Sequence, residues 1–377
     1  MKIVYYSYDH VANPYCGGGG AYRDYTINTL LASRHTINCY YGRFRGARAV
    51  ADRGLRSSFL GSSLNYPISR ITYALCATFH CLFVKADVIV ICYSIFSPVL
   101  GFVFRKKNVV LELFHLARSE PFRKYSVLGI IPYLFEQCAL LFGRNIICIN
   151  RGMADYISRK YKNKSIITVY TGFDSQILSE QIIDEKYILY MGRIDIHMKG
   201  IDVLIDSFEK IVPSFPGIRL IVAGRGSRHD TDWLRNRIRN SPAADVMLCK
   251  ENVSDAEKIS LFHGATFVCM PSRFEGWCIA AIEAAASSKA TIGTRIMGLD
   301  ESIRDRETGI LVSPDNADEL AGAMELLSRD TALRNRLGSN GYRRAVRQFT
   351  WDSISRQQEM YYLSCVNNAG STGAPAE

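Results

Sequence analysis

The chain has 377 residues, 48% of them hydrophobic, and a formal net charge of +10. This length exceeds what one hydrophobic core usually serves, so we expect two domains, each with an ample core. Eleven cysteines are scattered without a CxxC pair, which argues against both a disulfide framework and a zinc site.

The positive charge is concentrated in the N-terminal half. Residues 1–174 hold 22 Lys and Arg against 9 Asp and Glu, a net +13, and the remainder holds 24 against 27, a net −3. Such polarity favours an anionic partner: phospholipid headgroups, a pyrophosphate-linked lipid acceptor or nucleic acid. The alternative is that the charge only keeps the protein in solution. Five arginines near the apolar segment 64–84 favour a peripheral contact with an anionic membrane: Arg43, Arg45, Arg48, Arg53 and Arg56.

The N-terminus begins directly with a strand pattern at residues 2–6, so we expect no secretory leader and a cytoplasmic location. The longest apolar stretches, residues 71–84 and 127–142, fall short of the roughly 18 residues that a membrane-spanning helix needs. We therefore predict that both are core helices.

Short apolar runs alternate with helical patterns along the whole chain. The first series of predicted strands is 2–6, 38–41, 87–92, 109–114, 145–149 and 166–170, and the second is 187–191, 219–223, 246–249, 266–270, 290–293 and 309–312. This alternation is typical of parallel α/β sheets with helices on both faces. We predict two doubly wound domains, joined within the polar stretch 174–185, with ligands in a cleft between them.

Three motifs stand out in the first half. A glycine loop that includes Gly18 and Gly19 precedes a helix, where backbone N–H groups can face a phosphate or sugar, although a simple tight turn is the alternative. His115 follows the strand 109–114, so we expect it at the edge of the cleft, where it could contact a ligand. The alternative is a hydrogen-bonded core histidine. Arg151 follows the strand 145–149 and is a weaker candidate for a ligand contact.

In the second half, cations and glycines follow two predicted strands. Gly192 and Arg193 come directly after one strand, and Lys199 opens the next helix, so two cations are expected at the carboxyl edge of the sheet, suited to a diphosphate without a metal. Gly224 follows the strand 219–223 in a Gly-x-Gly turn that would let the backbone approach a ligand.

The most informative segment is 271–284, in which a strand, a short loop and a helix follow one another. The helix is predicted from Trp277, beginning near Gly276, so its unpaired N–H groups favour a phosphate. Glu275 lies in the loop and Glu283 lies about two helical turns further on. Neither can neutralise the other, so we expect both to accept hydrogen bonds from hydroxyl groups.

The spacing of Glu275 and Glu283 resembles the E-x7-E motif of retaining GT-B glycosyltransferases of sequence family four, the glycosyl transferases group 1. The segment 192–200, with Gly192, Arg193 and Lys199, is similar to the G-R-x…K-G motif of that family. The resemblance covers nearly the whole chain and is strongest over residues 187–312.

The resemblance implies a GT-B fold, in which two Rossmann-like doubly wound domains face a central cleft and a C-terminal helix crosses back to the first domain. It implies an acceptor domain at 1–174 plus about 352–366 and a donor domain at 175–351, and we expect a disordered tail at 367–377.

It also implies the site. Arg193 and Lys199 would bind the diphosphate, Glu283 the ribose, and Glu275 the sugar, together with the backbone of Gly276, Trp277, Cys278 and Ile279. Gly18, Gly19, Gly192 and Gly224 would line the donor site, and His115 would orient the sugar, so that His115, Arg193, Lys199 and Glu275 form the catalytic set. Cys278 stands where the family often has glycine, which leaves the choice of donor open.

The implied activity is transfer of a hexose from UDP- or GDP-sugar to an acceptor hydroxyl with retention, forming an α-glycosidic bond in polysaccharide, glycolipid or other glycoconjugate synthesis. We expect neither a metal nor a cofactor besides the nucleotide sugar, and a glycan, lipid-linked or small-molecule acceptor. The alternatives are a nucleotide-sugar epimerase of the same fold, a non-catalytic binding subunit, and a nucleic-acid-binding module.

Overall fold

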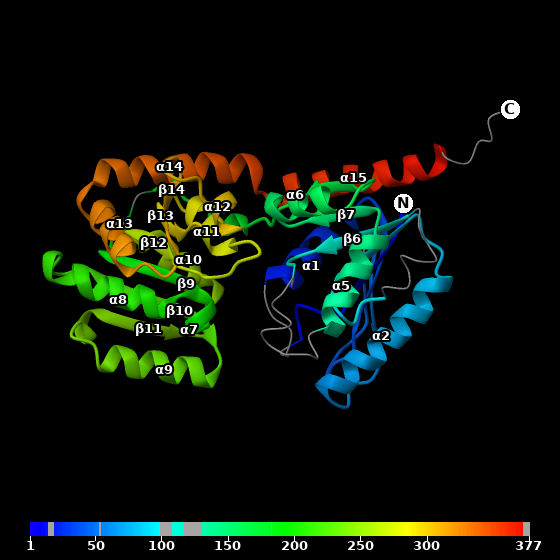
Figure 1. The fold of residues 1–377 in the computed structure, drawn as a ribbon, viewed down its shortest axis with the longest axis horizontal. Coiled ribbons are helices and arrows are strands. Elements are labelled where there is room, and N and C mark those ends of the chain that lie inside the picture. Colours follow the sequence, from blue (N-terminus) through cyan, green and yellow to red (C-terminus); the bar gives the residue numbers. More distant parts are fainter. Residues whose placement is uncertain (14–18, 53, 99–107, 117–129, 182, 372–377) are drawn as a thin grey trace. The chain divides into compact units, whose positions relative to one another are not determined.

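The computed structural model describes residues 1–377 except 14–18, 53, 99–107, 117–129, 182 and 372–377. The chain forms two compact units (Figure 1), and each is described here by itself. Unit 1 comprises Met1–Thr171 and Trp351–Glu377, and unit 2 comprises Gly172–Thr350. The predicted domain boundary was placed after Asp174, three residues further along the chain.

Unit 1 is built on an eight-stranded sheet with the order β3-β4-β2-β1-β5-β6-β7-β8. Its pairs are parallel except β3 with β4. The strands are β1 Lys2–Ser7, β2 Thr36–Gly42, β3 Val50–Asp52, β4 Leu55–Leu60, β5 Val88–Cys92, β6 Val109–Leu113, β7 Asn145–Cys148 and β8 Ser165–Thr168. The six predicted strands of this half are all present, and the short β3–β4 pair was not predicted.

The helices described in unit 1 are α1 Gly19–Leu31, α2 Tyr66–Phe83, α5 Ile130–Phe142, α6 Arg151–Lys160 and α15 Trp351–Ser371. The step from β1 to β2 crosses the sheet in one direction, and the steps from β4 to β5 and from β6 to β7 cross it in the other. Because such crossovers are right-handed, α2 and α5 cover one face of the sheet and α1 covers the opposite face. Helix α15 packs beside α1.

A buried polar network ties the C-terminal helix α15 to unit 1. Arg23 of α1, 1% exposed, donates to Glu112 of β6 at 2.5 Å and to Gln358 of α15 at 2.7 Å. The hydroxyl of Tyr5 on β1 donates to Glu112 at 2.8 Å. Burial raises the pKa of the neighbouring Asp24. Because buried charges need such partners, this network accounts for the return of the last helix to the first unit.

Unit 2 contains an all-parallel six-stranded sheet with the order β11-β10-β9-β12-β13-β14. The strands are β9 Tyr187–Ile194, β10 Arg219–Gly226, β11 Met247–Glu251, β12 Phe267–Met270, β13 Thr291–Thr294 and β14 Gly309–Val312. The helices are α7 Ile196–Lys199, α8 Ile201–Ile211, α9 Arg228–Arg239, α10 Asp255–Gly264, α11 Ile279–Ala286, α12 Leu299–Ser302, α13 Ala317–Arg329 and α14 Thr331–Gln348, with short 3₁₀ turns at Ser175–Ile177, Val212–Ser214 and Ala244–Val246.

Two Rossmann-like parallel-sheet units are therefore confirmed. Two expectations differ from the structure. Helix α15 continues to Ser371, where disorder was predicted from residue 367, and 372–377 lie outside the described residues. The apolar stretch 71–84 lies mostly in α2, and the described part of the stretch 127–142 forms α5. Both are surface helices with exposed apolar side chains rather than core helices. None of the helices in the described parts of the chain is long and apolar enough to cross a membrane.

Candidate functional site

The predicted residues of unit 2 gather where the strand order changes direction. β9 is followed along the chain by β10 on one side, whereas β12 lies on its other side and continues to β13 and β14. Ligands of open α/β sheets bind at the carboxyl ends of the strands at such a switch point. Arg193 belongs to the end of β9, and Glu275 lies in the loop after β12. The fold therefore brings the two motifs to one edge of the sheet.

Lys199 forms a salt bridge with Glu275. Nζ of Lys199 donates to Oε1 of Glu275 at 2.6 Å, and the two side chains are only 14% and 11% exposed. The hydroxyl of Ser272 donates to the same oxygen at 3.1 Å. The countercharge of Glu275 thus comes from a lysine 76 positions earlier in the chain, which local spacing did not indicate.

Lys199 owes its position to the turn between α7 and α8. Asp195 caps α7 by accepting from the amide of Met198 at 2.9 Å. Gly200 then adopts a left-handed conformation with φ of 64°, and a Cβ on it would lie 2.1 Å from the carbonyl oxygen of Pro271. Glycine is therefore required both by the backbone and by the close approach of the β12 loop.

Arg273 fastens the β12 loop to this turn. Its guanidinium donates to both carboxylate oxygens of Asp202 at 2.9 and 2.8 Å and to the carbonyl of His197 at 2.6 Å. Its amide donates to the carbonyl of Met198 at 3.0 Å. The hydrogen bonds from Asp202 raise the pKa of Arg273. The sequence motifs did not single out Arg273, although it stands between Ser272 and Glu275 in the segment that they highlighted.

Glu283 is also paired. It lies on α11, 8% exposed, and its Oε1 accepts from Nζ of Lys258 at 2.8 Å. Lys258 lies in the first turn and a half of α10, which begins with a capping box formed by Ser254 and Glu257. The capping box could have located this helix in the sequence, but no local pattern indicated that Lys258 faces α11.

Arg193 is the most exposed cation of the group, with 64% of its side chain accessible. Its nearest acid is Asp195, at 3.6 Å, and its own carbonyl accepts from the buried hydroxyl of Tyr190 at 2.7 Å. Burial, and then the charge of Glu275, raise the pKa of Tyr190 well above its ordinary value. Tyr190 therefore stays a neutral donor that fixes the end of β9.

Glycines bring the neighbouring loops close together. Gly224 has φ of 153°, and a Cβ there would lie 1.7 Å from the carbonyl oxygen of its strand partner Gly192. Gly298, with φ of 91°, approaches the carbonyl oxygens of Gly276 and Glu275, because a Cβ on it would lie 2.7 and 3.1 Å away. A larger residue at Gly224 would push the end of β10 away from β9, and one at Gly298 would push the loop after β13 away from the loop that holds Glu275.

Helix α11 begins later than predicted. Its first residue is Ile279 and its N-cap is Cys278, so Gly276 and Trp277 belong to the loop. Trp277 is 8% exposed and packs edge-to-face on Phe349 at 5.5 Å between ring centroids, which makes it a support for the loop. Burial raises the pKa of the Cys278 thiol, so this residue behaves as a small apolar side chain.

The remaining predicted residues belong to unit 1. Gly19 is the first residue of α1, and Gly18 lies outside the described residues. The side chain of His115, directly after β6, is exposed. A Cβ on Gly20 would lie 3.5 Å from the ring of Phe114, so the start of α1 and the end of β6 are neighbours. Arg151 begins α6, after β7.

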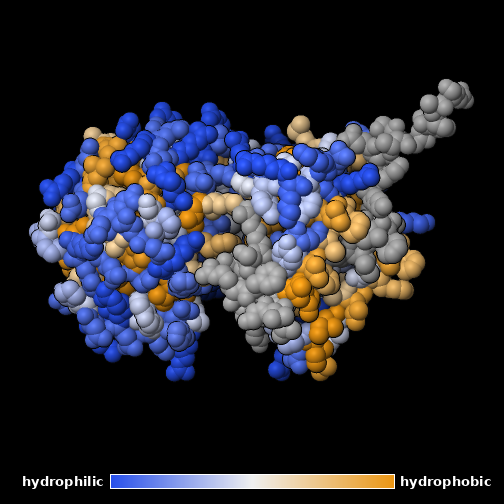
Figure 2. Space-filling view, viewed as in Figure 1, coloured by the Kyte–Doolittle hydropathy of each residue, from blue (hydrophilic) through white to orange (hydrophobic). Residues whose placement is uncertain are grey.

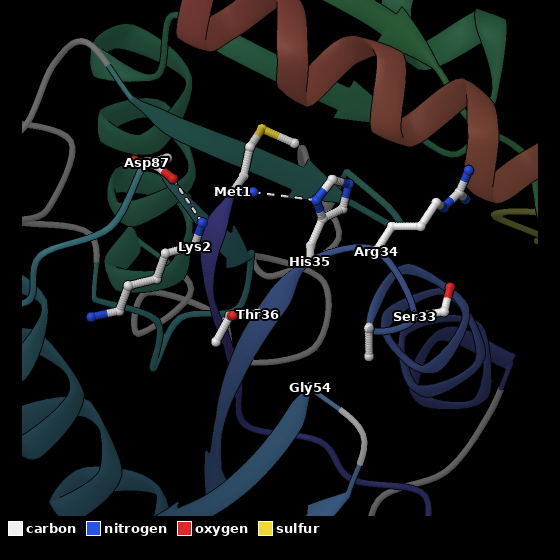
Figure 3. Close-up of a pocket in the computed structure, with 9 residues that line it drawn as sticks. Met1, Lys2, Ser33, Arg34, His35, Thr36, Gly54 and Asp87 are labelled. Atoms are coloured by element: carbon white, nitrogen blue, oxygen red, sulfur yellow. Dashed lines mark hydrogen bonds between the residues drawn. The ribbon is translucent and has the colours of Figure 1, made fainter.

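A cavity in unit 1 lies at the other edge of its sheet (Figure 3). Its lining includes Met1, Lys2, Thr36 and Asp87, which stand at or before the amino ends of β1, β2 and β5. The N-terminal amino group contacts Nδ1 of His35 at 3.3 Å, and the amide of Lys2 donates to Asp87 at 2.7 Å. Because ligands of such sheets bind at the carboxyl ends, this cavity is not the candidate site. The described residues contain no group of three His, Cys, Asp or Glu that could hold a metal ion.

Comparisons with known proteins show which family and which folds the chain resembles. Residues 173–344 match the family model of the glycosyl transferases group 1. An uncharacterized glycosyltransferase of Methanocaldococcus jannaschii is 28% identical over 55% of this chain and 56% of its own length. The capsular polysaccharide biosynthesis glycosyltransferase CapM of Staphylococcus aureus is 29% identical over 65% of this chain and 70% of its own length. The chain spans about half the length of most of the curated relatives it matches.

Solved structures match nearly the whole chain. Sucrose-phosphate synthase from Thermosynechococcus elongatus is 19% identical, with a TM-score of 0.82 over 98% of this chain and all of its own. The Anabaena protein HepE in complex with UDP-glucose is 16% identical, with a TM-score of 0.75 over 97% of this chain and all of its own. These likenesses show the fold. In sequence, residues 173–344 are similar to the glycosyl transferases group 1.

Proposed function

We propose that the protein is a retaining glycosyltransferase that moves a hexose from UDP- or GDP-sugar to an acceptor hydroxyl and forms an α-glycosidic bond. The observation that carries this proposal is the pair of Lys199 and Glu275, nearly buried beside the exposed Arg193 at the switch point of unit 2. This arrangement offers a diphosphate two cations and offers a sugar a carboxylate, all on one sheet edge.

Arg193 and Lys199 would bind the diphosphate. An ammonium group has three N–H donors, and Lys199 uses one of them on Glu275. The other two can serve phosphate oxygens while Glu275 keeps the side chain in place. Arg193 adds a planar fork of donors from the end of β9. These cations would stabilise the departing nucleotide diphosphate without a metal.

Glu275 and Glu283 would hold the two sugars of the donor. Glu275, with the backbone from Gly276 to Ile279, would bind hydroxyl groups of the hexose, and Glu283 would accept from the ribose. Lys258 orients Glu283 and supplies its countercharge, because an isolated carboxylate that is 8% exposed would be costly to bury. Oε2 of Glu283 is then the oxygen that can accept from a ribose hydroxyl.

The transfer would occur on one face of the hexose. The bond from the anomeric carbon to the phosphate oxygen breaks, the acceptor oxygen forms the new bond from the same side, and the departing phosphate oxygen takes the acceptor proton. No protein nucleophile takes part, so the chain contributes position and electrostatic stabilisation. By the family resemblance, His115 orients the hexose, and Gly18, Gly19, Gly192 and Gly224 shape the donor site.

We further propose that the acceptor is a glycan or a lipid-linked molecule of cell-surface polysaccharide or glycolipid synthesis, reached from the cytoplasm at an anionic membrane. The similarity to a capsular polysaccharide glycosyltransferase supports the pathway, and the +13 charge of residues 1–174 supports the membrane. The UDP-glucose complex of the Anabaena protein supports UDP as the first nucleotide to test.

The test is release of nucleotide diphosphate from a set of UDP- and GDP-sugars, with and without acceptor extracts, by the full chain. We expect release from at least one donor and its loss in Lys199→Met. The matched control is Lys210→Met, which removes a lysine that pairs with Asp318 on the surface of the same unit. Equal activity of both variants would contradict the site. Conversion of the donor without any acceptor, with a changed sugar as product, would favour an epimerase.

A further inference from the structure

Helix α2 turns its apolar side outward. Every exposed residue between Tyr66 and Phe83 is apolar or aromatic, whereas its buried residues include Ser69. Four of the side chains are more than half exposed, with accessible fractions of 55 to 69%: Ile71, Leu75, Phe79 and Phe83. A helix that served only to cover the sheet would show the opposite pattern, with polar residues toward water.

Helix α5 repeats this inversion. Its exposed residues are all apolar, and its one acid, Glu136, points inward with 2% exposure. The most exposed side chains are Ile131 at 53%, Leu134 at 51% and Leu141 at 59%. In contrast, the exposed residues of α9 in unit 2 are all polar or charged. The pattern of α2 and α5 is therefore the inverse of that on α9.

The two helices contribute to one apolar surface. Right-handed crossovers place them on the same face of the unit 1 sheet. Figure 2 shows hydrophobic side chains gathered over the region that α2 and α5 occupy in Figure 1. Exposed apolar side chains gathered in this way mark an interaction site in a natural protein.

Cations border this surface. The hydroxyl of Ser69 in the first turns of α2 donates to the carbonyl of Arg43 at 2.6 Å, which places the exposed loop with Arg43, Arg45 and Arg48 beside α2. At the other helix, Nζ of Lys164 donates to the carbonyls of Leu141 and Gly143 at the end of α5, at 2.7 and 2.6 Å. Helix α2 contains no acidic residue at all.

We infer that the outward faces of α2 and α5 insert into the interface of an anionic bilayer, with the bordering cations on the lipid headgroups. The inference identifies the surface behind the membrane contact of the proposed function, on which it rests. Apolar side chains flanked by Lys and Arg are the pattern of helices that lie in a membrane interface. A second copy of this chain on the same surface would bring like charges together, because the bordering groups are cations and α2 has no acidic residue, so the charge favours an anionic bilayer.

Co-sedimentation of the full chain with vesicles tests this inference, using phosphatidylcholine alone and phosphatidylcholine mixed with phosphatidylglycerol. We expect binding to the mixed vesicles and at least about a tenfold loss of partitioning in Leu75→Gln/Phe79→Gln and in Leu134→Gln/Phe135→Gln. The matched control, Met360→Gln/Leu363→Gln, removes two exposed apolar side chains of α15, 71% and 42% accessible, and should bind like the wild type.

Thermal stabilisation by UDP or GDP, measured without vesicles, separates this inference from the proposed function. Intact nucleotide binding in every variant, with lipid binding lost only in the α2 and α5 variants, supports the inference. Unchanged lipid binding in those variants overturns it even if the nucleotide site is correct. Concentration-dependent dimerisation without lipid, abolished by the same substitutions, would also overturn it, because the surface would then pair two copies of the chain.

Discussion

Gly200 links the lysine motif to the glutamate loop, so its replacement tests how the site is built. Alanine at this position would have to adopt φ of 64°, which costs about 1–2 kcal/mol for a residue with a Cβ. In addition, the Cβ would lie 2.1 Å from the carbonyl oxygen of Pro271, a backbone atom that must move. We expect Gly200→Ala to lower the free energy of unfolding by about 2–4 kcal/mol and to displace Lys199 from Glu275.

Gly217 supplies the matched control for this prediction. It also has a positive φ, 92°, but nothing lies within 4 Å of a Cβ built there. Gly217→Ala should therefore lose only the backbone cost, about 1–2 kcal/mol, and keep nucleotide binding. Urea unfolding followed by tryptophan fluorescence, combined with thermal shifts by UDP and GDP, compares the two variants. Equal destabilisation and equal nucleotide binding would refute the argument that Gly200 holds the two loops together.

Three further predictions follow from the charged groups of unit 2. Lys258→Met should weaken nucleotide diphosphate binding about tenfold in calorimetry, because Glu283 loses its partner. Arg273→Lys should destabilise unit 2 by about 1–2 kcal/mol in urea and lower turnover, because one ammonium cannot replace the paired hydrogen bonds to Asp202. Burial lowers the pKa of Lys289 to about 8, so the charged form of this side chain opposes folding below that pH. As the pH rises from 8 toward 10.5, the free energy of unfolding of the wild type should therefore increase by up to about 3 kcal/mol relative to that of Lys289→Met.

Controls distinguish these effects from general damage. Arg237 makes a similar double contact, at 2.6 and 2.8 Å, with Glu209 away from the β12 loop, so Arg237→Lys should lose stability without losing turnover. An equal fall in turnover in both arginine variants would remove Arg273 from the site. For Lys289, a stability difference that stays constant from pH 7 to pH 10.5 would contradict the lowered pKa.

The parallel-strand core could be predicted from the sequence because each strand is a short apolar run. A buried β-strand can be recognised from its own apolar residues, whichever strands it pairs with, and every predicted run corresponds to a strand. Strand β3 was missed because Val50–Asp52 is too short to show a period, and β4 was missed because three polar residues, 56–58, interrupt its apolar run. The disordered tail was placed too early, since the polar composition after residue 366 concealed the continuation of α15 to Ser371.

The site could be predicted only as far as local motifs reach. Lys199, Glu275 and Glu283 were identified by spacing, but their pairing depends on which loops the fold brings together. Lys258 and Arg273 carry no motif of their own, and their importance follows from contacts with residues distant in the sequence. The apolar segments of α2 and α5 were assigned to the core for a related reason: hydrophobicity does not reveal which side of a helix the sheet covers.

Calorimetric titration of the full chain with UDP and GDP tests the central claim most directly. The account predicts that one nucleotide diphosphate binds with one site per chain, and that Glu283→Gln weakens this binding at least about tenfold, through the lost charge at the ribose. Absence of binding by either nucleotide, or equal affinity in wild type and Glu283→Gln, would contradict the assignment of a nucleotide-sugar site to unit 2.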